Sequence, residues 1–242
     1  MDTSLLEKEE KLIRQSIRRK YDKSNDNAAP LYDGVVDAEK YLSAKPKICW
    51  ILKEPYDSDY PAYEGGGWSI VKDYLGQDKD KLAPQLQASQ TWRRITYVTY
   101  SILNKFLAYS KLSNIKEKPE MADALREIAA INVSKMPATS TSKDAAIKKK
   151  YEFWKPVLLR QLKSYDPQIL IFGNTFKHFR VDLEIDDAEM KGDPKLYYVL
   201  KNNKLYLNAY HPGVRGYTIS EGDYCQGLID VVKKNIKKLQ LF

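Results

Sequence analysis

Polar side chains stand at or just beyond the ends of several short apolar runs in this sequence. Glu54 follows the run at 48–52, Asn132 lies within the run at 130–133, Asn174 follows 169–173, and His211 follows 205–209. A carboxylate can orient and polarise a water molecule, an amide both donates and accepts hydrogen bonds, and an imidazole can stabilise developing negative charge. These residues form a candidate site if the fold brings them together.

The pattern of the surrounding segments predicts an α/β fold. Apolar runs of about five residues indicate strands that are buried on both faces. Amphipathic segments indicate helices at about 4–23, 91–110, 151–165 and 223–239. Asn202 and Asn203 separate 197–199 from 205–209 and predict a hairpin. We expect one domain, residues 1–242, with three α/β/α layers around a central, mainly parallel sheet of about four strands. Its strand ends would form one ligand-binding rim.

The composition argues against several classes of protein. Of 242 residues, 43% are hydrophobic and 30% are charged, which is atypical of disordered or fibrous chains. No apolar stretch approaches the roughly 20 residues that cross a bilayer, and the N-terminus lacks the apolar core of a signal peptide, so a cytoplasmic location is expected. Cys49 and Cys225 cannot build a disulfide framework or a four-cysteine centre, and His178 and His211 are the only histidines. We expect no metal and no organic cofactor.

The net charge of +8 makes a polyanionic partner plausible. Lysine and arginine total 40, against 32 acidic residues. The excess gathers in two clusters, Lys143, Lys148, Lys149, Lys150, Lys155, Arg160 and Lys163, and then Lys233, Lys234, Lys237 and Lys238. Each cluster either faces phosphates or is the solvated face of an amphipathic helix.

Several motifs occur in the order that one enzyme family shows. Residues 52–56, Leu-Lys-Glu-Pro-Tyr, are similar to Gly-Gln-Asp-Pro-Tyr, and 65–69, Gly-Gly-Gly-Trp-Ser, to a glycine and an aromatic before serine. Residues 132–137 contain an Asn-x-x-Lys run, 166–173 a strand preceded by proline and closed by glycine, and 211–213 His-Pro-Gly in place of His-Pro-Ser. On these motifs the chain resembles the uracil-DNA glycosylase superfamily between residues 48 and 217. The resemblance implies that family's α/β/α fold and its excision of bases from DNA.

The resemblance implies two catalytic residues. Glu54 would orient the attacking water and stabilise the positive charge that develops on the sugar. His211 would donate a hydrogen bond to the departing base as that base becomes negative. From the residues alone, Glu54 could instead cap the following loop or pair with Lys53, and His211 could be a histidine packed at a strand end.

Four further residues would bind the base. Asn132 would read the pairing edge of uracil, and Trp68 would stack on the extruded ring. Tyr56 stands where the family excludes the methyl group of thymine, and Pro55 belongs to the same motif. The alternatives are that Asn132 only terminates a strand and that Trp68 belongs to the core.

DNA contacts are expected from residues beside these motifs. They are Lys135, Ser140, Lys143, Gly213 and Arg215. Lys135 and the hydroxyl-rich stretch after it are candidates for phosphate contacts, although a flexible surface connection is the alternative for that stretch. Arg215 stands where relatives often carry a leucine that enters the duplex, so it could fill the gap left by the base or bind a phosphate.

The sequence departs from the family pattern at positions that matter for activity. Leu52 replaces a glycine, Glu54 is one methylene longer than aspartate, and Gly213 replaces a serine. The iron–sulfur cysteines of the thermophilic branch are absent. The implied substrate is uracil, or a related damaged base, in single- or double-stranded DNA. Two other functions stay open: a non-catalytic nucleic-acid-binding module of the same fold, and an α/β protein that binds nucleotides or phosphate esters.

Overall fold

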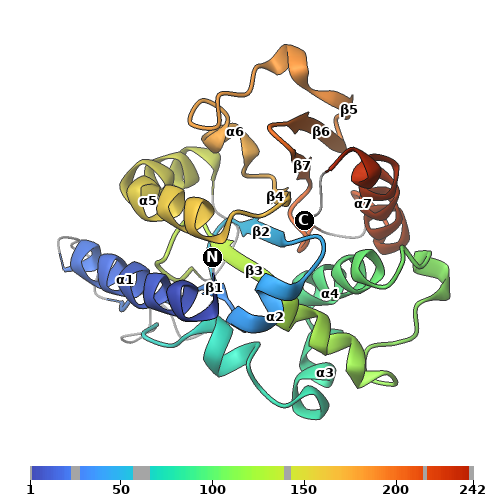
Figure 1. The fold of residues 1–242 in the computed structure, drawn as a ribbon, viewed down its shortest axis with the longest axis horizontal. Coiled ribbons are helices and arrows are strands. Elements are labelled where there is room, and N and C mark those ends of the chain that lie inside the picture. Colours follow the sequence, from blue (N-terminus) through green and yellow to red (C-terminus); the bar gives the residue numbers. More distant parts are fainter. Residues whose placement is uncertain (1, 23–27, 57–65, 139–142, 215–216, 240–242) are drawn as a thin grey trace.

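The computed structural model describes residues 2–22, 28–56, 66–138, 143–214 and 217–239. In this part of the chain a seven-stranded mixed sheet forms the centre, with the order β1-β3-β2-β4-β7-β6-β5 (Figure 1). The strands are β1 Gly34–Val35, β2 Ile48–Leu52, β3 Ile128–Asn132, β4 Ile169–Gly173, β5 Lys191–Asp193, β6 Leu196–Lys201 and β7 Lys204–Ala209.

The neighbouring strands β3, β2, β4 and β7 run parallel and form the buried middle of the sheet. All five residues of β2 are buried. Trp50 and Leu52 belong to the hydrophobic core on one face of the sheet, whereas Cys49 and Ile51 belong to the core on the other face. A strand covered on both sides has no polar face, which explains the continuous apolar runs of the sequence.

The expected sheet of about four strands corresponds to this parallel part, but the whole sheet is larger. β1 pairs antiparallel with β3 at one edge, and β6 and β5 extend the other edge, also antiparallel. β1 has only two residues, and every residue of β5 is exposed. Neither strand therefore has the apolar run or the alternation that predicts a strand.

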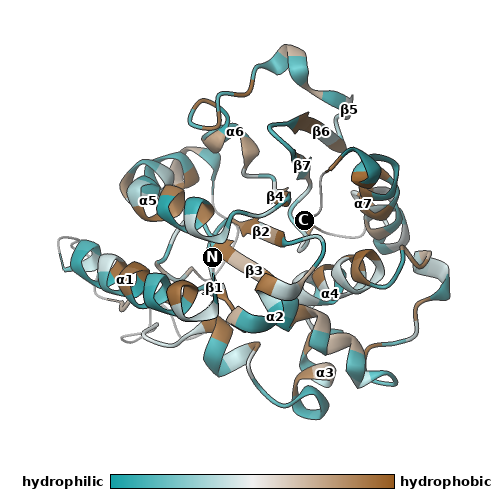
Figure 2. Ribbon diagram, in the orientation of Figure 1, coloured by the Kyte–Doolittle hydropathy of each residue, from teal (hydrophilic) through white to brown (hydrophobic). Residues whose placement is uncertain are grey.

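Helices cover both faces of the sheet and make three layers (Figure 1). The described α-helices are α1 Thr3–Tyr21, α2 Ala38–Ser43, α3 Lys79–Ala88, α4 Gln90–Leu103, α5 Asp144–Tyr165, α6 Phe176–Phe179 and α7 Glu221–Asn235. Segments of 3-10 or π helix occupy Ile70–Tyr74, Tyr109–Lys111, Pro119–Glu127, Asp187–Glu189 and Ile236–Lys238. In Figure 2 the hydrophobic colours gather on the central strands and on the helix faces turned toward them.

The two helix boundaries that differ most from the predicted ones do so for local reasons. α4 ends at Leu103 rather than near residue 110, because Lys105 and Phe106 adopt positive φ angles of 59° that a helix cannot continue through. α5 begins at Asp144 rather than near 151. In the first six residues of α5 only Ile147 is buried, so the apolar periodicity there is weak.

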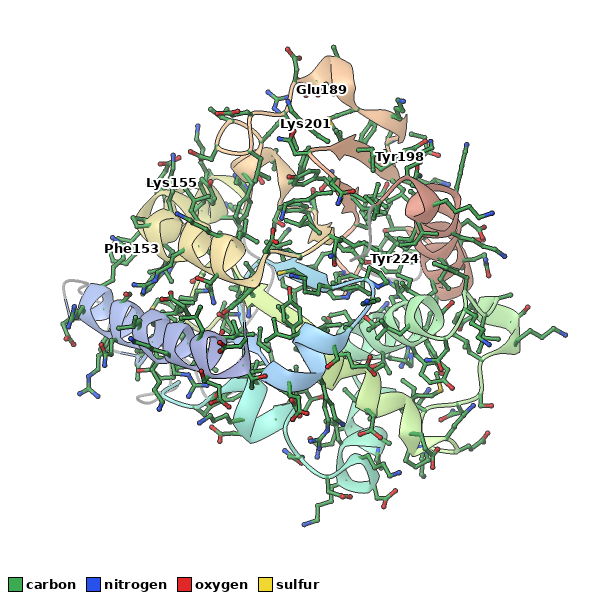
Figure 3. All side chains as sticks on the ribbon, in the orientation of Figure 1. Phe153, Lys155, Glu189, Tyr198, Lys201 and Tyr224 are labelled. Carbon is green, nitrogen blue, oxygen red and sulfur yellow. The ribbon has the colours of Figure 1, made fainter. Side chains whose placement is uncertain are left out.

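The N-terminal helix α1, which the motifs did not explain, covers one face of the sheet beside α5. It buries Leu6, Ile13 and Ile17. At its far end Lys20 Nζ lies 4.4 Å from the ring centroid of Phe153, which Figure 3 labels on α5. Across the described residues, no helix is both long and apolar enough to cross a membrane.

Candidate functional site

A pocket of about 850 Å³ opens at the carboxyl ends of the parallel strands. Each strand contributes to its wall: Leu52 ends β2, Asn132 ends β3, Asn174 follows β4, and His211 follows β7. Parallel strands bring their carboxyl ends to one edge of a sheet, so residues distant in sequence meet there. Because Glu54 lines the same pocket, the predicted convergence of these polar side chains is confirmed.

Most of the predicted site residues lie in this pocket. Those that line it are Glu54, Pro55, Tyr56, Trp68, Asn132, His211 and Gly213. Lys135 is buried elsewhere, and Lys143 is exposed at the start of α5 without lining the pocket. Ser140 and Arg215 lie outside the described residues.

The His211 imidazole is held as a neutral ring. Its Nδ1 accepts a hydrogen bond of 3.1 Å from the backbone N–H of Gly213. A neutral imidazole whose Nδ1 is an acceptor carries its proton on Nε2. Burial, with a smaller contribution from the positive charge of Lys53, lowers the pKa of His211 from 6.5 to about 4. Near neutral pH, His211 is therefore uncharged and has Nε2–H as its one ring donor.

Close packing around His211 explains why residue 213 is glycine here. A Cβ on Gly213 would lie 2.7 Å from Thr91 Oγ1 and 3.1 Å from His211 Nδ1. Gly173 is also confined, though less tightly, because a Cβ there would lie 3.1 Å from Pro212 Cδ and 3.4 Å from His211 Cδ2. A serine at position 213 would therefore displace the hydroxyl of Thr91 or the histidine ring.

Glu54 stands on a segment that continues the pairing of β2 with β3. The carbonyls of Leu52, Lys53 and Pro55 accept hydrogen bonds from the backbone N–H groups of Val133, Ser134 and Ala138, at 2.9, 2.8 and 2.9 Å. Burial raises the pKa of Glu54, while Lys150 and Lys53 act in the opposite direction. Among the described residues, its Oε1 is buried without a hydrogen-bond partner. That oxygen is therefore available to a water molecule or a substrate group.

Asp33 fixes the orientation of Asn132. Asn132 is 3% exposed, and its backbone N–H and side-chain amide donate to Asp33 Oδ2 at 2.7 and 3.3 Å. This contact directs Nδ2 toward Asp33 and leaves Oδ1 and one N–H for a ligand. Sequence reasoning missed Asp33, which belongs to none of the motifs.

Lys135 is not placed to bind a phosphate, contrary to the sequence prediction. Its side chain is 0% exposed, and Nζ lies 2.8 and 2.9 Å from the two carboxylate oxygens of Asp33. The ammonium also donates to the Asn132 carbonyl at 2.9 Å and to Gln161 Oε1 at 2.8 Å. These acceptors satisfy the buried charge. The Asn-x-x-Lys spacing thus supports the strand end that carries Asn132.

Tyr56 and Trp68 reach the pocket in different ways. Tyr56 is 67% exposed, so its ring stands at the rim and does not enclose a base. Trp68 is partly buried against the core, and its carbonyl accepts a 3.1 Å hydrogen bond from the Tyr32 N–H. Gly66 has a structural cause, because a Cβ there would lie 1.9 Å from the carbonyl oxygen of Ala29. The close approach is to backbone rather than to a ligand.

No protein-family model and no curated protein matches this sequence. The geometry of the pocket therefore carries the functional assignment. Within the described residues, no three His, Cys, Asp or Glu side chains are grouped so that they could hold a metal ion.

One wall of the pocket comes from residues that no motif indicated. Ser89 caps α4 by accepting a 3.4 Å hydrogen bond from the Trp92 N–H, and the Trp92 ring lies 5.9 Å from that of Tyr74. Tyr217, which is 85% exposed, lines the mouth. Trp92 reaches the pocket through the packing of α4 on the sheet, whereas Tyr74 and Tyr217 come from other segments, so the local sequence of these residues gave no signal. Lys53 also lines the pocket, although the sequence indicates it only as a neighbour of Glu54.

Proposed function

We propose that this protein excises uracil, or a related damaged base, from DNA by hydrolysing the N-glycosidic bond, and that its fold is of the uracil-DNA glycosylase type. The observation that carries the proposal is the meeting of Glu54, Asn132 and a neutral His211 in one pocket at the strand ends. DNA as the partner and the cytoplasm as the location belong to the same proposal.

A water molecule oriented by Glu54 supplies the oxygen of the new bond in this reaction. As the N-glycosidic bond breaks, its electron pair stays with the base, and the sugar gains oxocarbenium character. The Glu54 carboxylate stabilises that positive charge and orients a water whose oxygen attacks the anomeric carbon. The water gives up one proton, and the departing base takes up one, so the products are the free base and an abasic sugar. The unpartnered Oε1 supports this role.

His211 acts on the leaving group. A neutral imidazole donates Nε2–H to the carbonyl oxygen of the base on which negative charge develops, and this bond strengthens only as the base departs. A charged imidazolium is disfavoured because burial lowers the pKa of His211 to about 4. The fixed turn of Gly213 holds Nδ1, so little reorganisation accompanies the reaction.

The binding residues orient the base before cleavage. Asn132 offers Oδ1 and one N–H to the pairing edge of uracil, because its other bonds go to Asp33. Trp68 and Trp92 supply aromatic walls that suit an extruded ring. Tyr56 and Tyr217 stand at the mouth, where they would contact nucleotides beside the extruded one.

The test uses end-labelled single- and double-stranded oligonucleotides that contain uracil, hypoxanthine or a thymine mismatch, followed by alkaline cleavage of abasic sites. The wild type is expected to release uracil. His211→Ala is expected to lose at least about 100-fold in the rate of release, with little loss of DNA binding. His178→Ala is the matched control, because His178 lies on α6, beside Asp144, and does not line the pocket.

A second function is favoured by the scarcity of basic side chains in the pocket. Lys135 is buried, and Lys143 does not line the pocket. Among the described residues that line the pocket, Lys53 is therefore the one lysine. A free nucleotide or another small phosphate ester needs fewer phosphate contacts than DNA. Saturable binding of a mononucleotide, without preference for oligonucleotides, would support this function. Salt-sensitive DNA binding without base release would instead indicate a non-catalytic module.

A further inference from the structure

Arg94 is a buried cation that the proposed reaction does not use. It lies on α4, its side chain is 1% exposed, and it does not line the pocket. A buried guanidinium is costly unless its donors find acceptors. The contacts of Arg94 therefore indicate what it is for.

Its acceptors are backbone carbonyls of the segment that follows His211. Nη1 donates to the carbonyls of Pro212 and Val214 at 3.0 and 2.9 Å, and Nη2 donates to that of Ile219 at 3.4 Å. One planar, rigid guanidinium thus holds several carbonyls of this segment in fixed relative positions. A lysine ammonium on its flexible side chain would hold them less firmly. Gln90, one turn earlier on α4, donates to the same Val214 carbonyl at 2.6 Å.

The charge of Arg94 is balanced on the side of α7. Its Nε lies 3.9 Å from Glu221 Oε2, and its guanidinium carbon lies 5.0 Å from the ring centroid of Tyr224. Figure 3 labels Tyr224 on the α7 side of the sheet. Glu221 is itself held by Arg93 Nε at 2.8 Å and by the Tyr109 hydroxyl at 3.0 Å. Arg94 is therefore fixed from α7 while it holds the turn after β7.

We propose that Arg94 is a positioning residue for His211. The peptide groups that it holds flank Gly213, whose N–H donates to His211 Nδ1, and the Val214 N–H donates to the His211 carbonyl at 2.8 Å. By fixing Pro212 and Val214, Arg94 keeps the Gly213 N–H directed at Nδ1 and the ring packed in place. Nε2–H then remains the donor. The importance of this for catalysis rests on the proposed function, but the geometric role does not.

The direct test is the pKa of His211, measured by NMR from the ring protons. The chain has only two histidines, so His178→Ala assigns the signals, and in the other variants His178 serves as an internal reference. Arg94→Lys keeps the positive charge but replaces the rigid fork, whose Nη1 and Nη2 reach different carbonyls, with a single nitrogen on a shorter, flexible side chain. Arg94→Lys and Arg94→Gln are both expected to raise the pKa of His211 from about 4 toward 6.5, because a loosened turn hydrates the ring. The pKa of His178 is expected to stay unchanged.

Arg93→Gln is the matched control. It removes a positive charge from the adjacent position of α4 and an ion pair with Glu221, but Arg93 makes no described contact with residues 211–214. The pKa of His211 is expected to stay low in this variant. If Arg94→Lys leaves the pKa of His211 unchanged, or if Arg93→Gln raises it equally, the proposal is wrong.

A milder variant provides a second test in case the Arg94 variants do not fold. Gln90→Ala removes the second donor to the Val214 carbonyl and leaves Arg94 in place, so it is expected to raise the pKa of His211 by a smaller amount. If neither Arg94 variant folds, an unchanged pKa in Gln90→Ala overturns the proposal.

Base release gives a separate readout. If the wild type is active, Arg94→Lys is expected to lower kcat about 10- to 100-fold while oligonucleotide affinity changes less than about threefold. If the wild type releases no base, the proposed function fails, but the His211 titration still decides whether Arg94 positions the ring. Equal losses of kcat and affinity would contradict a role in positioning.

Discussion

Glu54 and His211 have opposite requirements in the proposed reaction, and these set its pH dependence. Glu54 acts only when ionised, and burial raises its pKa above the ordinary 4.5. His211 must be neutral, which it is at any pH well above about 4. As the pH falls, Glu54 therefore protonates first, so kcat/KM is expected to decrease about 10-fold per pH unit below a midpoint above 4.5.

Variants at the two positions separate these contributions. Glu54→Gln is expected to lose at least about 100-fold in kcat/KM, and its residual activity should not show this decrease of kcat/KM at low pH. His211→Ala should retain the decrease at low pH, with a lower kcat/KM throughout. If the decrease persists in Glu54→Gln and disappears in His211→Ala, then it arises from His211 and not from Glu54.

Gly213 offers a test of packing at single-residue scale. Gly213→Ala would place a Cβ 2.7 Å from Thr91 Oγ1, so we expect a loss of about 1–2 kcal/mol in the free energy of unfolding. Thr91→Ala removes that oxygen, and in the double variant the Gly213→Ala penalty is expected to shrink by at least half. Urea denaturation measures all four proteins of this cycle. Additive losses would show that Thr91 is not the obstacle.

At the scale of elements, α1 carries a buried carboxylate, that of Glu10, which makes the stability of the fold depend on pH. Glu10 of α1 and Tyr165 of α5 both approach β1, since a Cβ on Gly34 would lie 2.8 Å from Glu10 Oε1 and 2.5 Å from the Tyr165 hydroxyl. Burial raises the pKa of Glu10 from 4.5 to about 7. The folded state therefore binds more protons than the unfolded state between these values, and Glu10 lowers stability progressively as the pH rises from 4.5 to 7.

Glu10→Gln removes this pH dependence. The variant is expected to be more stable than wild type at pH 8 by up to about 3 kcal/mol, with the difference shrinking toward pH 4.5. Urea denaturation at several pH values measures it. Glu9→Gln is the control, because Glu9 pairs with the partly exposed Arg160 at 3.0 Å and should lose about 1 kcal/mol or less without that trend. A stability difference independent of pH would contradict the role of Glu10.

The elements also show how far the sequence predicts this molecule. β2 and β4 occur at their predicted bounds because full burial makes their runs apolar throughout, and the β6–β7 hairpin turns at Asn202 and Asn203, both at positive φ. β1 and β5 depend on pairing with a neighbour and have no local signal. The sites of Glu54, Asn132 and His211 followed from strand ends alone. Asp33 and Arg94 could not be found that way, since a charged residue reveals its burial only through partners distant in sequence.

At the scale of the whole molecule, the fold divides the basic clusters between two ends. α5 begins after β3 at the pocket end of the sheet, and Lys150 is close enough to influence the pKa of Glu54. α7 begins after the His211 turn at the same end and runs away from it, which carries Lys233 and Lys234 to the opposite end. Farther along α5, Lys155 is paired with Asp182 and Arg160 with Glu9. The lysines at the start of α5 are thus the ones near the pocket.

This division yields a matched pair of charge reversals. Lys148 and Lys149 are exposed near the pocket end of α5, and Lys233 and Lys234 are exposed in the last turn of α7. If DNA is the ligand, reversing Lys148 and Lys149 to Glu should weaken binding at least about 10-fold at 0.1 M salt and lower the salt slope by about 2, because each lysine near a phosphate displaces about one counterion. Reversing Lys233 and Lys234 changes net charge equally but should change affinity less than about threefold. Equal losses for the two pairs would mean that net charge alone drives binding, and the pocket end would then have no special role in holding DNA.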